Sequence, residues 1–195
     1  MKTLIVSAGL ILYGAKGQLN RHLTDLTQTT LKELGYDLKF SDTTSAWNME
    51  TELAKLLWAD IVIYITPIMW FNIPSSLSRW LEEVLVYGKT FGGAREYGEG
   101  GLVPASKFMI VATSNLKSSN LGSGFVLRNI PHIDNILQPL ILTNLYLSIR
   151  IKIPTFHADD VVFGDTSWIE DSFKNHLIKY FEKVSDGPLE ATNCT

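Results

Sequence analysis

The sequence predicts a single α/β domain built on a doubly wound parallel sheet of five strands. Segments patterned like strands and segments patterned like helices alternate from one end of the chain to the other. The strongest strand, residues 61–65, is apolar on both faces, as a central parallel strand must be. With 195 residues, 46% of them apolar, the chain can bury one sizeable core. We expect the domain to span residues 1–186, followed by a loose tail at residues 187–195.

The spacing of apolar residues places the individual strands and helices. Short apolar runs predict strands at residues 3–7, 37–41, 61–65, 108–112 and 152–157. Apolar residues at helical spacing predict helices at residues 19–34, 49–57, 77–85 and 133–147, and a last helix that begins at Asp165 or Thr166. The segment at 136–151 carries more apolar residues than one face of a helix needs, so we expect a partner to cover it in a homodimer.

Charge and cysteine content exclude several classes of protein. Surfaces that bind nucleic acid or anionic lipid are basic, and the net charge of −3 does not indicate such a surface. The only cysteine is Cys194, so no intramolecular disulfide can form, which is typical of a reducing compartment. The apolar stretch at residues 4–12 is too short for a signal peptide or a membrane span. We therefore expect a cytoplasmic protein without a membrane span.

Three loops are the expected ligand site, because ligands of doubly wound sheets bind beyond the carboxyl ends of the strands. The loops are residues 9–17, 66–74 and 113–124. The first joins a strand to the N-terminus of a helix and contains two glycines and Lys16, which favours a bound phosphate. It is neither a P-loop nor a G-x-G-x-x-G fingerprint, and an ordinary strand–helix turn remains the alternative.

The second loop places large aromatic side chains in a turn bounded by Pro67 and Pro74. Trp70 and Phe71 would be costly to leave exposed there, and a flat heteroaromatic ligand would cover them well. Packing of Trp70 in the core or in a dimer interface is the alternative, and both interpretations are compatible.

Several segments resemble the NAD(P)H:quinone reductases of flavodoxin-like fold, most closely the modulator of drug activity B proteins. The resemblance covers most of the chain, with gaps, at residues 17–20, 58–64, 67–75, 97–103, 113–115 and 156–161. Its most specific parts are the Pro-Ile-Met-Trp-Phe-Asn-Ile-Pro turn at 67–74 and the Tyr-Gly-Glu-Gly-Gly-Leu segment at 97–102. It implies a flavodoxin-like fold and hydride transfer from NAD(P)H, through bound FAD or alternatively FMN, to a quinone.

The resemblance also implies which residues do this. Those expected to bind the flavin are Lys16, Gly17, Gln18, Leu19 and Asn20 at the phosphates, Pro67, Ile68, Met69, Trp70 and Phe71 at the ring, and Thr113, Ser114 and Asn115 after the fourth strand. Tyr97 would lie over the acceptor, from either subunit of a dimer. Trp70 and Tyr97 are the residues expected beside the reacting groups.

Departures from the family pattern leave two questions open. Gly14 and Ala15 stand where the family usually has His and Ser, so a phosphate contact is lost unless Lys16 replaces it. The Tyr and His that serve some members as a proton relay have no match after the fourth strand, so the proton donor is unassigned. A transporter's flavin-binding ancillary subunit and an FMN electron carrier are the alternative functions. His157 with Asp159 and Asp160 fits a strand exit better than a metal site.

Overall fold

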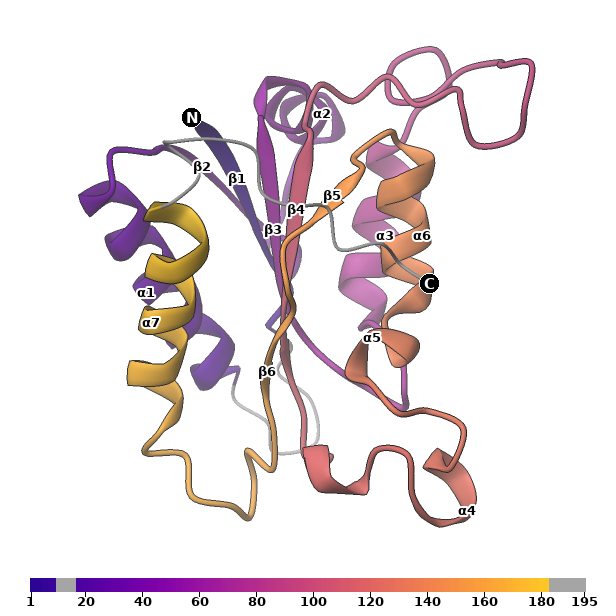
Figure 1. Ribbon diagram of the computed structural model, residues 1–195. Coiled ribbons are helices and arrows are strands. Elements are labelled where there is room, and N and C mark those ends of the chain that lie inside the picture. The colour runs from indigo at the N-terminus through magenta and orange to yellow at the C-terminus, as the bar shows by residue number, and fades with distance from the viewer. Residues whose placement is uncertain (10–16, 183–195) are drawn as a thin grey trace.

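The computed structural model describes residues 1–9 and 17–182, and a parallel sheet lies at its centre (Figure 1). The strand order is β2-β1-β3-β4-β5, with β6 also paired to β4, and every pair is parallel. The strands are β1 (Lys2–Ser7), β2 (Asp37–Asp42), β3 (Ile61–Pro67), β4 (Lys107–Thr113), β5 (Ile151–Lys152) and β6 (Phe156–Ala158). The predicted doubly wound sheet of a flavodoxin-like fold is therefore confirmed.

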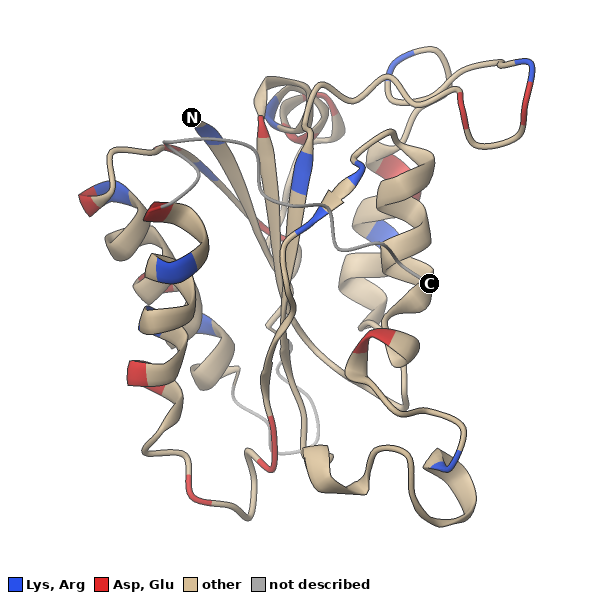
Figure 2. Cartoon of the chain, in the orientation of Figure 1, with Lys and Arg blue, Asp and Glu red and all other residues tan. Residues whose placement is uncertain are grey.

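Helices cover both faces of the sheet. One layer consists of α1 (Gln18–Glu33) and α7 (Ile169–Phe181), and the opposite layer of α2 (Met49–Trp58), α3 (Ser75–Val84) and α6 (Gln138–Tyr146) (Figure 1). Three short helices, η1 (Ser118–Asn120), α4 (Gly124–Leu127) and α5 (Ile133–Ile136), follow β4. Basic and acidic residues of the described chain are interspersed over both layers (Figure 2).

The central strands show why their sequence is apolar without alternation. In β3, Val62 and Tyr64 pack against the α2–α3–α6 layer, and Ile61, Ile63 and Ile65 pack against the α1–α7 layer. All five side chains are fully buried. Because helices cover both faces of the sheet here, no side chain of β3 faces solvent, which explains the continuous run of apolar residues.

Two predicted elements are interrupted by proline. The single helix expected at residues 133–147 is wrong, because it is divided at Leu137 into α5 and α6. Pro139 lies in the first turn of α6, the position at which its missing N–H costs nothing. The strand expected at 152–157 is likewise split into β5 and β6, because Pro154 cannot donate a hydrogen bond to β4.

The last helix, α7, begins later in the chain than the sequence predicts. The last helix starts at Ile169 rather than at Asp165 or Thr166, because the Asp165 carboxylate accepts a hydrogen bond from the Ser167 N–H and forms a separate turn (2.9 Å). The predicted tail at 187–195 lies outside the described residues. Within the described ranges, no helix is both long and apolar enough to cross a membrane.

A buried carboxylate, Glu52, joins α2 to α3, and we expect its loss to destabilise the fold. Glu52 accepts from the Trp80 indole N–H (2.9 Å) and from Lys55 (2.6 Å) and is 3% exposed. Burial alone would raise the pKa of this carboxyl, but donors from Lys55, Ser41 and Trp80 hold the pKa below its ordinary value. Glu52 therefore stabilises the fold above its unfolded pKa, and this contribution is lost as the pH falls through the folded pKa.

In urea unfolding at neutral pH, Glu52→Ala should lower the free energy of unfolding by roughly 3 kcal/mol, because it leaves a buried donor unpaired. Glu50→Gln changes an exposed carboxylate on the same helix and should cost under about 1 kcal/mol. An equal loss in both variants would contradict the structural role of Glu52.

Candidate active site

The described parts of the three predicted loop regions, namely the start of α1 and the ends of β3 and β4, meet at Thr113, the last residue of β4. The Thr113 carbonyl accepts a hydrogen bond from the backbone N–H of Ile68, just beyond β3 (2.8 Å). The Asn20 side chain, in the first turn of α1, donates to Thr113 Oγ1 (3.1 Å). Asn20 and Thr113 are both buried. The start of α1 and the ends of β3 and β4 therefore form one site at the carboxyl edge of the sheet, the lower end in Figure 1.

The N-terminus of α1 is suited to an anion. Gly17 precedes the helix in the left-handed conformation (φ 63°), which favours glycine. No side chain among the described residues caps the helix, and its first turn contains no acidic residue. Gly9 lies so close to α1 that an added Cβ would be 3.1 Å from Asn20 Cβ. Free N–H groups and the positive end of the helix dipole would thus face a phosphate, while Lys16 lies outside the described residues.

Residues 69–72 form a strained hairpin turn. Met69 and Asn72 exchange two backbone hydrogen bonds (2.8 and 3.0 Å), and between them Trp70 and Phe71 have φ of 50° and 61°. Two consecutive residues with positive φ are typical of a type I′ turn, in which Asn and Gly are the usual residues. Left-handed backbone at a bulky side chain costs about 1–2 kcal/mol per residue, and such strain concentrates at functional sites.

The strained turn points its aromatic side chains at solvent. Trp70 is 91% exposed and Phe71 is 50% exposed. The alternative that Trp70 packs in the core of its own chain is therefore wrong. An exposed indole held in a costly backbone conformation indicates a ligand that covers it, and a flat ring system fits this shape.

The loop after β4 is fixed by hydrogen bonds to β6, and only some of its predicted site residues are exposed. The Ser114 N–H donates to the Ala158 carbonyl (3.0 Å), and Ser114 Oγ lies 2.8 Å from His157 Nε2. Thr113 and Ser114 are buried and fix the loop, whereas Asn115 is exposed. Of the predicted loop residues, Asn115 is the one that is free to meet a ligand with its side chain.

Most predicted site residues therefore lie on the converging loops, and Tyr97 is the exception. The residues brought together are Gly17, Gln18, Leu19, Asn20, Pro67, Ile68, Met69, Trp70, Phe71, Thr113, Ser114 and Asn115. Tyr97 lies in the long loop between α3 and β4, at the opposite end of the sheet (Figure 1). Its ring packs against Tyr146 of α6 (5.5 Å between centroids) and is 96% exposed. Within one chain, Tyr97 does not reach the loops.

His157, which the sequence interpretation placed at a strand exit, lies next to the loop after β4. Its Nδ1 lies 3.2 Å from Ser118 Oγ, and its Nε2 contacts Ser114. Burial lowers the pKa of this imidazole, and the Asp159 carboxylate opposes the shift without cancelling it. In the described part of the chain, no group of three or more His, Cys, Asp or Glu side chains could hold a metal ion. The signal in the sequence was a histidine at the carboxyl end of a strand.

Fold and site together define a doubly wound α/β protein that binds a ligand at the carboxyl edge of its sheet. Residues 1–182 match the family described as having a flavodoxin-like fold. The chain belongs to this family.

Known relatives agree with the predicted resemblance to NAD(P)H:quinone reductases. The chain is 26% identical to the NADPH:quinone oxidoreductase MdaB of Haemophilus influenzae, over 93% of this chain and 100% of the relative. A putative quinone reductase from Klebsiella pneumoniae superimposes with a TM-score of 0.72 at 20% identity, covering 95% and 85% of the two chains. An FMN-dependent NADH-azoreductase from Bacillus anthracis, in complex with FMN, gives 0.69 at 12% identity, covering 95% and 100%. These two structures support the fold.

Proposed function

We propose that the protein is a flavin-dependent NAD(P)H:quinone oxidoreductase. The observation that carries the proposal is the strained turn at residues 69–72, which presents Trp70 to solvent at the same edge of the sheet as the N-terminus of α1. A flavin has both a flat ring for the turn and a phosphate for the helix. The named activities of the quinone reductase relatives support the same reaction.

The residues present fit a flavin. Backbone N–H groups of Gly17, Gln18 and Leu19 would hold the phosphates, since the side chain of Asn20 is engaged by Thr113. Trp70 and Phe71 would stack along the ring, and the exposed Asn115 would meet its edge. When bound, the flavin supplies two-electron hydride chemistry, and the protein supplies binding, orientation and exclusion of water.

Both FAD and FMN are compatible with the proposal. The sequence resemblance favours FAD, whereas the Bacillus anthracis neighbour is a complex with FMN. The preference for FAD therefore receives no support from the comparisons, and the mass of the cofactor released from purified protein will decide. NAD(P)H and the quinone would occupy the exposed face of Trp70 in turn, which predicts parallel lines in double-reciprocal plots.

A homodimer would complete the site. Leu142 of α6 is 54% exposed, and the groove of about 520 Å³ beside it is lined by Leu145, Tyr146 and Arg150, with Tyr97 at its edge. A two-fold partner is the commonest cover for such a surface. A second copy would also bring Tyr97 to the acceptor side of the loops, which the fold of one chain does not allow.

The dimer can be tested by a charge on this face. Leu142→Glu should shift the mass measured by sedimentation equilibrium from twice 21.8 kDa towards 21.8 kDa, because a carboxylate would be buried at the interface. Val162→Glu adds the same charge at another exposed apolar residue, in the loop before α7, and should leave the dimer intact. A wild-type mass near 21.8 kDa with full activity would rule out a shared site.

Steady-state oxidation of NADPH and NADH with menadione tests the reaction itself. The reductase should consume the nicotinamide only when flavin and quinone are both present. A flavin-loaded protein that is silent with several quinones and co-purifies with a membrane protein would instead support an ancillary subunit of a transporter.

A further inference from the structure

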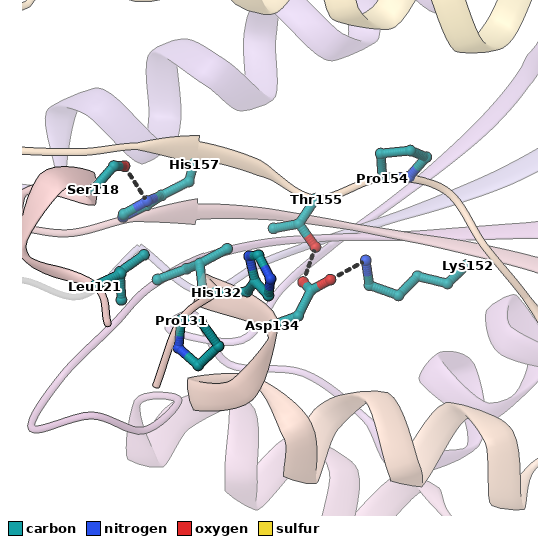
Figure 3. Close-up of a pocket in the computed structure, with 10 residues that line it drawn as sticks. Ser118, Leu121, Pro131, His132, Asp134, Lys152, Pro154, Thr155 and His157 are labelled. Carbon is teal, nitrogen blue, oxygen red and sulfur yellow. Dashed lines mark hydrogen bonds and ion pairs between the residues drawn. The ribbon is translucent and has the colours of Figure 1, made fainter. Parts of the chain in front are cut away.

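A cleft of about 570 Å³ lies beside the edge strands of the sheet (Figure 3). One wall is formed by β5, β6 and the segment between them, and the other by η1, α5 and the end of the segment that joins them. None of the described residues that line it is among those expected to bind the flavin. Small-molecule sites usually have volumes of about 300–1,000 Å³, so the cleft is large enough to be a second site.

The two walls present apolar side chains to each other. Pro154 lies on the strand wall, and Leu121 and Pro131 lie on the opposite wall (Figure 3). Both prolines and Leu121 are at least partly exposed, so their surfaces are open to a ligand. A flat ring inserted between the walls would be covered by apolar atoms on both faces, which is the main source of affinity in such sites.

Full charges in the cleft are already paired. Lys152 of β5 and Asp134 of α5 form an ion pair (2.7 Å), and Asp134 also accepts a hydrogen bond from Thr155. Figure 3 shows both contacts at one end of the cleft. A ligand that carries a phosphate, carboxylate or ammonium group would have to compete with this pair, so the cleft favours a neutral ligand.

Uncharged polar groups occupy the other end of the cleft. Phe156 and Ala158 point into the α1–α7 core, so His157 between them points to the opposite face and into the cleft. Its Nδ1 lies 3.2 Å from Ser118 Oγ, and His132 lines the cleft from the loop wall.

These groups suit a ligand hydroxyl. Burial lowers the pKa of His157, and Asp159 opposes this shift without cancelling it. A neutral imidazole has one donor and one acceptor nitrogen, and the hydroxyl of Ser118 can both donate and accept. A phenolic hydroxyl also donates and accepts, so it can join the hydrogen-bonded pair of Ser118 and His157 in either tautomer of the ring.

We propose that this cleft binds a neutral hydroxylated aromatic compound of one or two fused rings. The ring lies between the two apolar walls, and a hydroxyl group bonds to Ser118 and His157. Hydroquinones belong to this class of compound. The inference does not depend on the proposed function, because no residue assigned to the flavin takes part in the cleft.

Naphthoresorcinol is a suitable probe, because its two hydroxyl groups are meta to each other and do not form a simple quinone. Added to the purified protein, it should shift the ring-proton NMR signals of His132 and His157 along one saturable curve. We expect a dissociation constant below about 1 mM. The dimethyl ether of naphthoresorcinol, which has no donor, should bind roughly 5-fold or more weakly.

Leu121→Trp should lower the affinity for naphthoresorcinol roughly 10-fold or more, because the indole fills the cleft. Val126→Trp adds the same ring at an exposed residue of the same segment that does not line the cleft, and should leave the affinity within about twofold. If Leu121→Trp does not fold, Ser118→Ala serves instead. It removes an exposed hydroxyl from the cleft and should lower the affinity about 2- to 10-fold.

Three results would overturn the inference. The first is the absence of saturable shifts at His132 and His157. The second is an unchanged affinity in Leu121→Trp or, if that variant does not fold, in Ser118→Ala. The third is binding of naphthoate or of the dimethyl ether as tight as that of naphthoresorcinol, which would contradict the neutral hydroxylated class.

Discussion

Trp70→Asn should strengthen the flavin-free fold and weaken flavin binding, two effects of opposite sign. Trp70 has φ of 50°, a conformation that asparagine tolerates and a bulky residue resists. Relief of this strain should raise the free energy of unfolding by about 1 kcal/mol. Loss of the 91% exposed indole removes its stacking on the ring, worth about 1–3 kcal/mol, so flavin affinity should fall about 5- to 150-fold.

Urea unfolding and fluorescence titration with flavin, on the same preparations, measure both quantities. Trp168→Phe is the control: Trp168 packs against Phe156 (6.2 Å between centroids), away from the turn, and should leave flavin affinity unchanged. Unchanged affinity in Trp70→Asn would remove Trp70 from the site. A parallel loss of stability and affinity would contradict the assignment of strain to this turn.

Gly101→Ala should cost about 3 kcal/mol or more of folding stability, because the added Cβ would meet backbone. It would collide with the peptide between Leu147 and Ser148, at the end of α6. A methyl group on the neighbouring Gly100 would likewise meet the Gly92 carbonyl. Gly101 therefore lets the loop that carries Tyr97 dock on α6, and Gly100 lets this loop fold back onto its own backbone at Gly92. In the proposed dimer, Gly101→Ala should also displace Tyr97 and lower quinone reduction without changing flavin affinity.

The matched control lies in the same loop. A Cβ on Gly92 would meet only the Leu102 side chain, at an ordinary 3.7 Å, so Gly92→Ala should change the free energy of unfolding by less than about 1 kcal/mol. Thermal unfolding of both variants decides. A Gly101→Ala protein as stable as the wild type would show that the loop does not dock on α6.

The sheet could be predicted from sequence because its physical causes are local. β3 and β4 are covered by helices on both faces. Burial on both faces requires apolar residues at successive positions, and such a run is visible in the sequence. The site loops followed from topology, since ligands bind beyond the carboxyl ends of parallel strands. The aromatic turn was visible because Trp70 and Phe71 stand between two prolines.

Contacts that the pattern of residue types does not encode account for what the sequence did not show. The positive φ of Trp70 and Phe71 depends on the Met69–Asn72 pairing and contradicts the intrinsic preference of both residues. His157 meets Ser114, 2.8 Å away, only because β6 pairs with β4. The position of Tyr97 depends on how a long loop docks on α6, and the spacing of apolar residues in the sequence does not predict such docking.

Flavin binding by the purified, flavin-free protein tests the assignment of the three loops most directly. Titration with FMN and with FAD should show saturable binding of one flavin per chain, with quenching of Trp70 fluorescence that is absent in Trp70→Asn. The released cofactor, identified by mass, should be the flavin that binds more tightly. Failure of both flavins to bind at concentrations up to about 100 μM would contradict the site.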